Sequence, residues 1–348
     1  MAKINVGVIG VGGWGKNHLR VYSELKEYCN VKAICDSNEQ RAKQFGRMYK
    51  VNWYTDFKNF LKEDLDGVSI CTPTSTHYST AMKVIKAGIN LLVEKPLAYK
   101  VSDALKIFRA VKTKRIKLTV GFIERFNSGV MKLRELIKKN ELGDLRYISS
   151  GRMSSWSPAI TNTGVITDVA IHDIDVIRFI LGKDPIEVYA KAQNRIKKHP
   201  PQYETNAEIF LTFPDGESAY LVAEWLKPVE KHKKIRQLQV TGSKGTAILS
   251  YIPQLVWKID AVDIVSPFID VNGRPKYRTD PKNVSLLEPI PWKEPLKLEL
   301  KNFIETLANN EKPVVSGLDG VRALEVAETA LKSARLKTPQ TITYTSLK

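Results

Sequence analysis

The chain has 348 residues, of which 43% are hydrophobic and 26% are charged, and this length predicts about two domains that each bury a core. No apolar run approaches the roughly 18 residues of a membrane span, and the N-terminus lacks a signal-peptide layout, so we expect a cytoplasmic protein without membrane contact. The formal net charge is +17, but lysines and arginines are scattered and form no basic stripe with aromatic residues, which argues against nucleic-acid binding. Such a surface would still attract a small anionic substrate.

Strands and helices alternate through the first third of the chain. Apolar runs predict strands at residues 3–9, 31–35, 67–72, 90–95 and 117–122, and helical patterns lie at 14–29, 38–49, 75–88 and 101–115. Near-continuous apolar strands separated by helices are typical of a parallel sheet covered on both faces. We therefore expect an α/β, doubly wound Rossmann domain over residues 1–122.

The pattern changes after residue 122. A helix at 128–140, a strand at 145–153 and a helix at 168–181 precede strands at 186–193, 207–213, 218–226, 235–242, 245–252 and 255–260. Strands without intervening helices indicate an open, mainly antiparallel sheet. Residues 266–294 are expected to form a long loop, and helices at 295–309 and 318–337 complete an α+β domain over residues 123–348.

The glycine-rich turn after the first strand fits two phosphate-binding motifs. Gly10-x-Gly12-x-x-Gly15 matches the dinucleotide fingerprint, whereas a phosphate loop needs Ser or Thr after Lys16 and position 17 is Asn. Asp36 ends the second predicted strand, where a dinucleotide fold needs an acidic residue for the ribose hydroxyls. The turn is therefore predicted to hold the pyrophosphate of a dinucleotide, with the helix dipole directed at its charge.

Several side chains are expected around this cofactor. Asp36 would repel a 2′-phosphate, which favours NAD over NADP, although Ser37 and Arg41 lie close to it in sequence. Ligands of such sheets bind beyond the carboxyl ends of the strands. The predicted cofactor-binding residues are Gly10, Gly12, Gly13, Trp14, Gly15, Asp36, Ser37, Arg41, Thr72, Pro73, His77, Glu94 and Lys95.

A helix in the second half carries a histidine between two carboxylates. Asp168, His172 and Asp175 are spaced i, i+4 and i+7 and so share one helical face, and Thr167 is a plausible N-cap. A carboxylate can fix the tautomer of an imidazole that acts as a general base. The alternative is a structural histidine that stabilises the helix. His199 lies in a basic, polar stretch and is expected in solvent.

Hydride transfer from a secondary alcohol to NAD⁺ needs a group that takes the hydroxyl proton and a donor that polarises the oxygen. His172 can take the proton. Lys95, at a strand end near the predicted nicotinamide, can polarise the hydroxyl oxygen. A surface lysine after a strand is the alternative reading of Lys95. Cys29, Cys35 and Cys71 lack CxxC spacing and histidine partners, so we expect neither a disulfide framework nor a metal site.

The chain resembles the glucose–fructose oxidoreductase/inositol dehydrogenase/MocA family of NAD(P)-dependent sugar dehydrogenases. The resemblance runs from end to end and depends on "GVIGVGGWGKNH", "SICTPTSTHYSTAMKVIKAGINLLVEKP", "GFIERFN" and "DVAIHDID". It implies that Lys95 is the substrate-binding catalytic lysine, often before a cis peptide to Pro96. It also implies that Asp168 and the acid/base His172 are catalytic, with Asp175 in support. The open sheet of the second domain would form the interface of a homodimer or homotetramer.

Within this family, "GFIERFNSGVMKLRELI" is most similar to UDP-N-acetylglucosamine 3-dehydrogenases, which oxidise the sugar 3-hydroxyl. This similarity adds Glu124, Arg125 and Asn127 to Lys95, Asp168 and His172 as substrate-binding residues. Ser128 stands where those relatives usually carry Pro. Alternatively, "ERFN" links the domains, packs Phe126 and exposes its charges.

Other functions remain open on the sequence. One is oxidation of a free sugar or inositol, or reduction of a keto-sugar, by an enzyme of the same family. Another is a non-catalytic NAD-binding regulator, which would need only the cofactor site.

Overall fold

The computed structural model describes residues 3–157, 162–226, 235–251, 255–260, 268–269, 275–276, 284–287 and 293–346. The chain forms two compact units. The first comprises Met1–Ile123 and Glu294–Leu324, and the second comprises Glu124–Lys293 and Glu325–Lys348. The division expected after residue 122 has one boundary, whereas each unit here is built from two segments because the chain returns to the first unit.

The first unit contains a six-stranded, all-parallel sheet with the order β3-β2-β1-β4-β5-β6. Its strands are β1 (Ile4–Ile9), β2 (Cys29–Cys35), β3 (Asn52–Tyr54), β4 (Gly67–Ile70), β5 (Asn90–Glu94) and β6 (Leu118–Gly121). This order confirms the predicted doubly wound fold. The edge strand β3 was not expected, because three residues are too few to form a recognisable apolar run.

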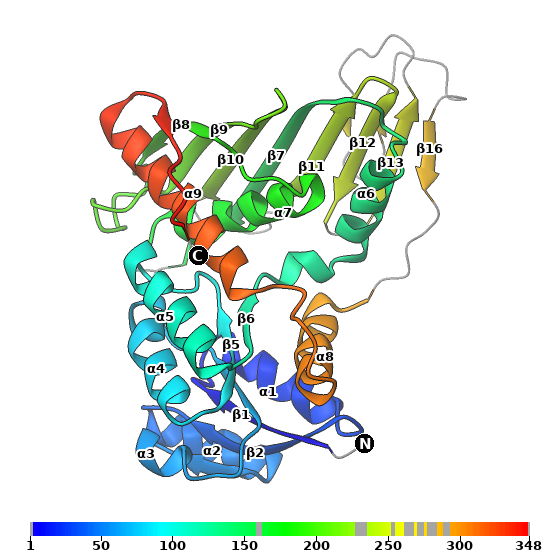
Figure 1. Ribbon diagram of the computed structural model, residues 1–348. Helices are drawn as coiled ribbons and strands as arrows, with labels where there is room; N and C mark the ends of the chain where they lie inside the picture. The colour runs from blue at the N-terminus through cyan, green and yellow to red at the C-terminus, as the bar shows by residue number, and fades with distance from the viewer. Residues whose placement is uncertain are drawn as a thin grey trace. The chain divides into compact units, whose positions relative to one another are not determined.

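Helices cover both faces of this sheet (Figure 1). They are α1 (Gly15–Glu24), α2 (Glu39–Tyr49), α3 (Phe57–Phe60), α4 (Thr74–Lys86), α5 (Val101–Lys114) and α8 (Pro295–Ala308). Helices α4 and α5 pack together, and α8 packs against α1. Leu296, Leu300 and Phe303 of α8 join the buried core formed by β1 and α1. The late segment is therefore an integral part of the first unit. Helix α1 ends earlier than predicted because Cys29 already begins β2.

The main sheet of the second unit has nine strands in the order β16-β13-β12-β11-β7-β10-β9-β8-β17. They are β7 (Leu145–Ser155), β8 (Glu187–Gln193), β9 (Asn206–Thr212), β10 (Ser218–Leu226), β11 (Ile235–Gly242), β12 (Gly245–Ser250), β13 (Leu255–Asp260), β16 (Val284–Leu287) and β17 (Gln340–Thr341). All neighbouring pairs are antiparallel except β7 and β10, which are parallel. The mainly antiparallel sheet predicted for this domain is therefore confirmed, and its one parallel pair arises because the chain leaves β7 through a helix before it reaches the hairpins.

Helices cover one face of this sheet (Figure 1). They are α6 (Ser128–Lys138), η2 (Ile166–Ala170), α7 (Ile171–Leu181) and the later part of α9 (Gly317–Leu336), and the short 3₁₀ helix η1 (Ile123–Phe126) precedes α6. Ile148 of β7, Leu211 of β9 and Ala219 of β10 are fully buried on the covered face. No helix among the described residues lies on the opposite face.

The segment expected as a long loop contains short strands. Strands β14 (Phe268–Ile269) and β15 (Pro275–Lys276) pair with each other, and β16 joins the main sheet; most of the other residues of that segment lie outside the described ones. None of the helices within the described ranges combines the length and the apolar character that crossing a membrane requires.

Candidate active site

The glycine turn between β1 and α1 has the shape that a pyrophosphate requires. Gly10 has a φ of 83°, and a side chain there would also crowd the carbonyl of Cys71. A Cβ on Gly15 would overlap the carbonyl oxygen of Gly10, so this glycine permits close packing of helix on strand. A Cβ on Gly12 would meet nothing nearer than 3.9 Å, and one on Gly13 nothing within 4 Å. The turn is therefore closely packed at Gly10 and Gly15 and open at Gly12 and Gly13, which fits a dinucleotide phosphate.

Asp36 follows β2 and is fixed by four hydrogen bonds. Its Oδ2 accepts the backbone N–H of Val11 at 2.9 Å, and its Oδ1 accepts that of Asn38 at 2.9 Å. Arg41 donates to both oxygens, from Nε to Oδ2 at 2.9 Å and from Nη2 to Oδ1 at 2.8 Å. Burial alone would raise the pKa of Asp36, but these bonds, led by that of Arg41, lower it below its ordinary value. Asp36 is therefore an anion beside the turn, and Ser37 is exposed next to it.

Glu94, at the end of β5, faces other protein groups. Its Oε1 accepts a hydrogen bond from the indole of Trp14 at 2.9 Å and lies 2.9 Å from Nε2 of the buried His18. Its Oε2 accepts the backbone N–H of Lys95 at 3.2 Å. The peptide from Lys95 to Pro96 is cis, as the family resemblance implies. Glu94 thus joins the glycine turn to the strand end that carries Lys95.

The turns after β4 and β5 are bridged by a buried histidine of α4. His77 places Nδ1 2.8 Å from the carbonyl oxygen of Pro96 and Nε2 2.9 Å from that of Thr72. Burial lowers the pKa of His77 below its ordinary value. Pro73 stands at the N-cap of α4. Carboxyl ends of parallel strands share one edge of a sheet, so the cofactor-binding residues predicted from sequence lie along a single edge of the first unit.

In the second unit, Asp168 and His172 lie on consecutive helical segments. Asp168 belongs to the π-helical turn η2, and His172 is the second residue of α7. Both are partly exposed, whereas Asp175, further along α7, is buried. Thr167 is not the N-cap, because the helix already begins at residue 166 with Val165 at that position. The π turn widens the helix at the point where Asp168 projects, and such turns are frequent at functional sites.

The segment "ERFN" is buried, so the reading with exposed charges is wrong. Arg125 donates to both oxygens of Asp175, from Nε at 2.8 Å and from Nη2 at 2.6 Å. Asn127 caps α6 by accepting the N–H of Gly129 at 2.9 Å. Glu124 accepts Arg152 Nη1 at 2.9 Å. In the structure these side chains bind protein groups, and substrate contact stays a prediction.

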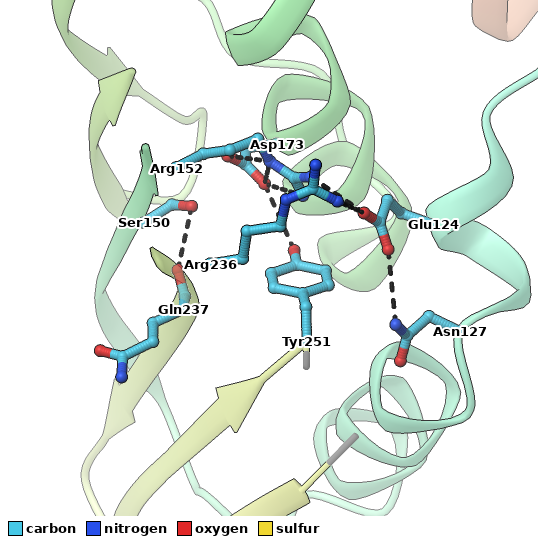
Figure 2. Close-up of polar contacts among 8 residues, drawn as sticks. All are labelled: Glu124, Asn127, Ser150, Arg152, Asp173, Arg236, Gln237 and Tyr251. Carbon is cyan, nitrogen blue, oxygen red and sulfur yellow. Dashed lines mark hydrogen bonds and ion pairs between the residues drawn. The ribbon is translucent and has the colours of Figure 1, made fainter. Parts of the chain in front are cut away.

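A buried polar network connects η1, β7, α7 and β11 (Figure 2). Arg152 Nε lies 3.1 Å and 3.0 Å from the two oxygens of Asp173, and its Nη1 binds Glu124. Tyr251 donates to Asp173 Oδ1 at 3.4 Å, and Arg236 Nη1 lies 3.6 Å from Glu124. Burial alone would lower the pKa of Arg152, but Asp173 and Glu124 raise it well above its ordinary value. Three buried charges and the partly exposed Arg236 thus compensate one another.

Sequence reasoning missed this network, although its signals were present. Arg152 shares the alternation of β7 with Ile148, which places it on the buried side of the strand. Asp173 lies one position from His172 on a helix that is buried nearly all round. His199, expected in solvent, is buried, with Nε2 3.0 Å from the carbonyl of Thr163. None of the described side chains gathers into a group of three or more that could hold a metal ion.

The fold and the glycine turn define a dinucleotide-binding oxidoreductase fold. Residues 4–122 match the model described as "Oxidoreductase family, NAD-binding Rossmann fold", and residues 130–248 match the GFO/IDH/MocA C-terminal domain. The chain belongs to the GFO/IDH/MocA oxidoreductase family, and its cofactor is NAD.

Two of three relatives align along nearly the whole chain, and the third aligns along about half of it. It is 26% identical to the uncharacterized oxidoreductase YrbE of Bacillus subtilis over 99% of this chain and 98% of that one. A UDP-N-acetylglucosamine 3-dehydrogenase of Acidithiobacillus ferrooxidans is 30% identical over 55% of this chain and 58% of its own length. An inositol 2-dehydrogenase of Rhizobium meliloti is 25% identical over 96% and 98%.

Solved structures agree in fold. The UDP-N-acetylglucosamine 3-dehydrogenase GnnA from Acidithiobacillus ferrooxidans superposes with a TM-score of 0.81 at 21% identity, covering 97% of this chain and 99% of that one. At this identity the superposition shows the fold alone.

Proposed function

We propose that the protein oxidises a secondary hydroxyl of a sugar or polyol with NAD, and that the substrate is a UDP-N-acetylhexosamine oxidised at its 3-hydroxyl. The observation that carries the proposal is the combination of a complete cofactor turn with Lys95 at one strand end and the Asp168–His172 pair on a helix of the second unit. A cofactor sensor would need only the first of these features.

In the proposed reaction each residue has one task. His172 takes the proton of the substrate hydroxyl, and Lys95 donates a hydrogen bond to the same oxygen. Asp168 and Asp175 support the imidazole from the same helical run. When bound, NAD⁺ supplies the acceptor for the hydride. In the reverse direction His172 returns the proton to the carbonyl oxygen, so the same residues serve reduction.

Three observations support the nucleotide-sugar substrate. The 30% identical relative is named for this activity, and the motif "GFIERFN" is similar to that subfamily. The surplus of 54 lysines and arginines over 37 acidic residues would also attract a pyrophosphate.

NADH production should be measured with a panel of UDP-sugars, free hexoses and inositols. We expect turnover with UDP-N-acetylglucosamine or its epimer. Turnover of inositol alone would remove the UDP-sugar substrate while leaving the oxidoreductase in place.

A second candidate is an inositol or free-sugar dehydrogenase. The observation that favours it is coverage, since the inositol dehydrogenase of Rhizobium meliloti aligns over 96% of this chain and the UDP-sugar enzyme over only 55%. The same panel separates the two candidates. If no sugar or polyol is oxidised while NAD still binds, the regulator is favoured.

We further propose a homodimer or homotetramer formed through the uncovered sheet face. Tyr147 of β7, Phe210 of β9 and Tyr220 of β10 lie on that face. Each is the chain neighbour of a buried residue, and successive side chains of a strand point to opposite faces. Tyr147 and Phe210 are exposed, and exposed aromatic rows are typical of protein interfaces. A Phe210→Lys variant should lower the mass measured by light scattering, and an unchanged mass would contradict this interface.

A further inference from the structure

Arg41 occupies the carboxylate that the adenosine ribose of NAD needs. Two hydrogen bonds of 2.9 Å and 2.8 Å join its guanidinium to both oxygens of Asp36. The Asp36 side chain is 3% exposed and the Arg41 side chain 40% exposed. The partner that can move is therefore the arginine, whose long side chain reaches the pair from the solvent side of α2.

The acceptor positions of Asp36 are filled. A carboxylate offers about four lone-pair positions. The backbone N–H groups of Val11 and Asn38 take two of them and are fixed by the turn and by the start of α2. Arg41 takes the other two. A ribose diol that donates to this carboxylate must therefore displace Arg41, since the backbone donors cannot move away.

The displaced guanidinium would remain beside the cofactor. The backbone N–H of Arg41 donates to Asn38 at 2.9 Å, which anchors its main chain in the first turn of α2. Its Cζ lies 3.9 Å from the position of a Cβ on Gly12. Arginine binds phosphate with two parallel hydrogen bonds, and a nearby arginine is the usual partner of a 2′-phosphate.

We propose that Arg41 is a selectivity residue that competes with the ribose of NAD for Asp36 and binds the 2′-phosphate of NADP. In the free protein it neutralises Asp36, so a 2′-phosphate does not meet an uncompensated carboxylate. NAD binding must break the ion pair, whereas NADP gives the released guanidinium a new anionic partner. The protein accordingly binds both cofactors, and Arg41 reduces its preference for NAD. This inference depends on the cofactor site alone, whatever the substrate.

The test compares Arg41→Met with the wild type in fluorescence titrations of NADH and NADPH, without any sugar. Met keeps the length of the side chain and removes its charge and donors. We expect NADH to bind about three- to tenfold more tightly and NADPH at least about tenfold more weakly. The matched control is Arg47→Met. Arg47 is exposed on the same helix, and its replacement removes the same charge.

A ratio of the two dissociation constants that changes less than about twofold, or a change of the same size in Arg47→Met, would overturn the proposal. Weaker binding of both cofactors would overturn it as well, because competition for Asp36 requires that NADH bind more tightly once Arg41 is replaced. The thermal midpoint without cofactor shows that the variants are folded. Because no turnover is measured, failure of the sugar assignment would leave this result unaffected.

Discussion

Lys95 and His172 are the side chains on which the proposed chemistry depends. Replacing a general base lowers turnover by about 10²- to 10⁴-fold, because the hydroxyl proton no longer has an acceptor. We expect His172→Gln and Lys95→Met each to lose kcat on this scale, and His172→Gln to bind NADH normally. Lys100→Met is the matched control, since Lys100 is exposed at the start of α5. An equal loss of kcat in the control would show that the loss of any positive charge lowers turnover, which would contradict a specific role for Lys95.

His77 should make stability depend on pH. Burial lowers its pKa, with Lys95 acting in the same direction and Glu94 and the two carbonyl contacts opposing. Protons therefore favour the unfolded chain, and the free energy of unfolding should fall as the pH drops below 6.5, the ordinary value, towards the folded-state pKa.

Urea unfolding at about pH 7.5 and about pH 5.5 measures this effect. His77→Gln should lose less stability between these pH values than the wild type does, because it has no proton to gain. An identical loss of stability in both proteins would show that groups other than His77 cause the fall in the free energy of unfolding at acidic pH.

At the scale of elements, the turn between β1 and α1 separates folding from cofactor binding. Gly15→Ala would force a methyl group into the Gly10 carbonyl, so we expect loss of stability. Gly12→Ala finds space in the protein but intrudes where the pyrophosphate approaches, so it should keep its thermal midpoint and lose NADH affinity. Gly151→Ala, in β7 of the second unit where a Cβ meets nothing within 4 Å, is the control and should keep both. Normal NADH binding by Gly12→Ala would contradict the assigned phosphate position.

Helix α8 carries a buried carboxyl group that costs stability. Glu299 is fully buried, and neither of its oxygens has a hydrogen-bond partner among the described residues. Burial, followed by the charge of Glu94, raises its pKa well above the ordinary value of 4.5. The folded protein holds a proton that the unfolded chain releases, so the free energy of unfolding should fall as the pH rises above 4.5 towards the raised pKa.

We therefore expect Glu299→Met to raise the free energy of unfolding by roughly 1–3 kcal/mol at neutral pH. Denaturant titration at several pH values would also show a flatter dependence. Glu305→Met, at a more exposed position of the same helix, should change little. A destabilised Glu299→Met protein would indicate that the carboxyl group has a favourable partner.

The elements were predictable to different degrees, for physical reasons. Runs such as "GVSIC" and "NLLVE" are mostly apolar and do not alternate with polar residues, so they identify buried parallel strands from local sequence alone. The parallel pairing of β7 with β10 depends on which distant strands meet, and local alternation carries no information about it. The π turn at Asp168 is a one-residue change in helix winding that a spacing argument based on regular α-helix does not detect.

The site divides in the same way. The glycines and Asp36 belong to a local motif, so the sequence was sufficient to predict the tight turn and the carboxylate beside it, and their contact with the cofactor stays a prediction. The charges of "ERFN" are buried because their partners come from β7 and α7, and a linear reading could not pair them with Arg152 or Asp175. Tyr251 joins the network only through the register of the sheet.

At the scale of the molecule, the net charge of +17 should influence how the substrate arrives. Attraction between exposed charges is screened over about 8 Å at physiological ionic strength. For an anionic UDP-sugar, we expect kcat/KM to fall several-fold, by about tenfold at most, when salt rises from about 20 to about 200 mM. An uncharged polyol is the control. Equal salt dependence for both would assign the effect to the enzyme itself.

The return of the chain to the first unit has a consequence for biosynthesis. The hydrophobic interior around β1 and α1 includes Leu296, Leu300 and Phe303, which the ribosome adds after nearly all strands of the second unit. A nascent chain of which only the first 123 residues have emerged from the ribosome lacks the side chains that α8 contributes to that core. The nucleotide-binding half therefore matures late in translation, although its diagnostic glycines are among the first residues made.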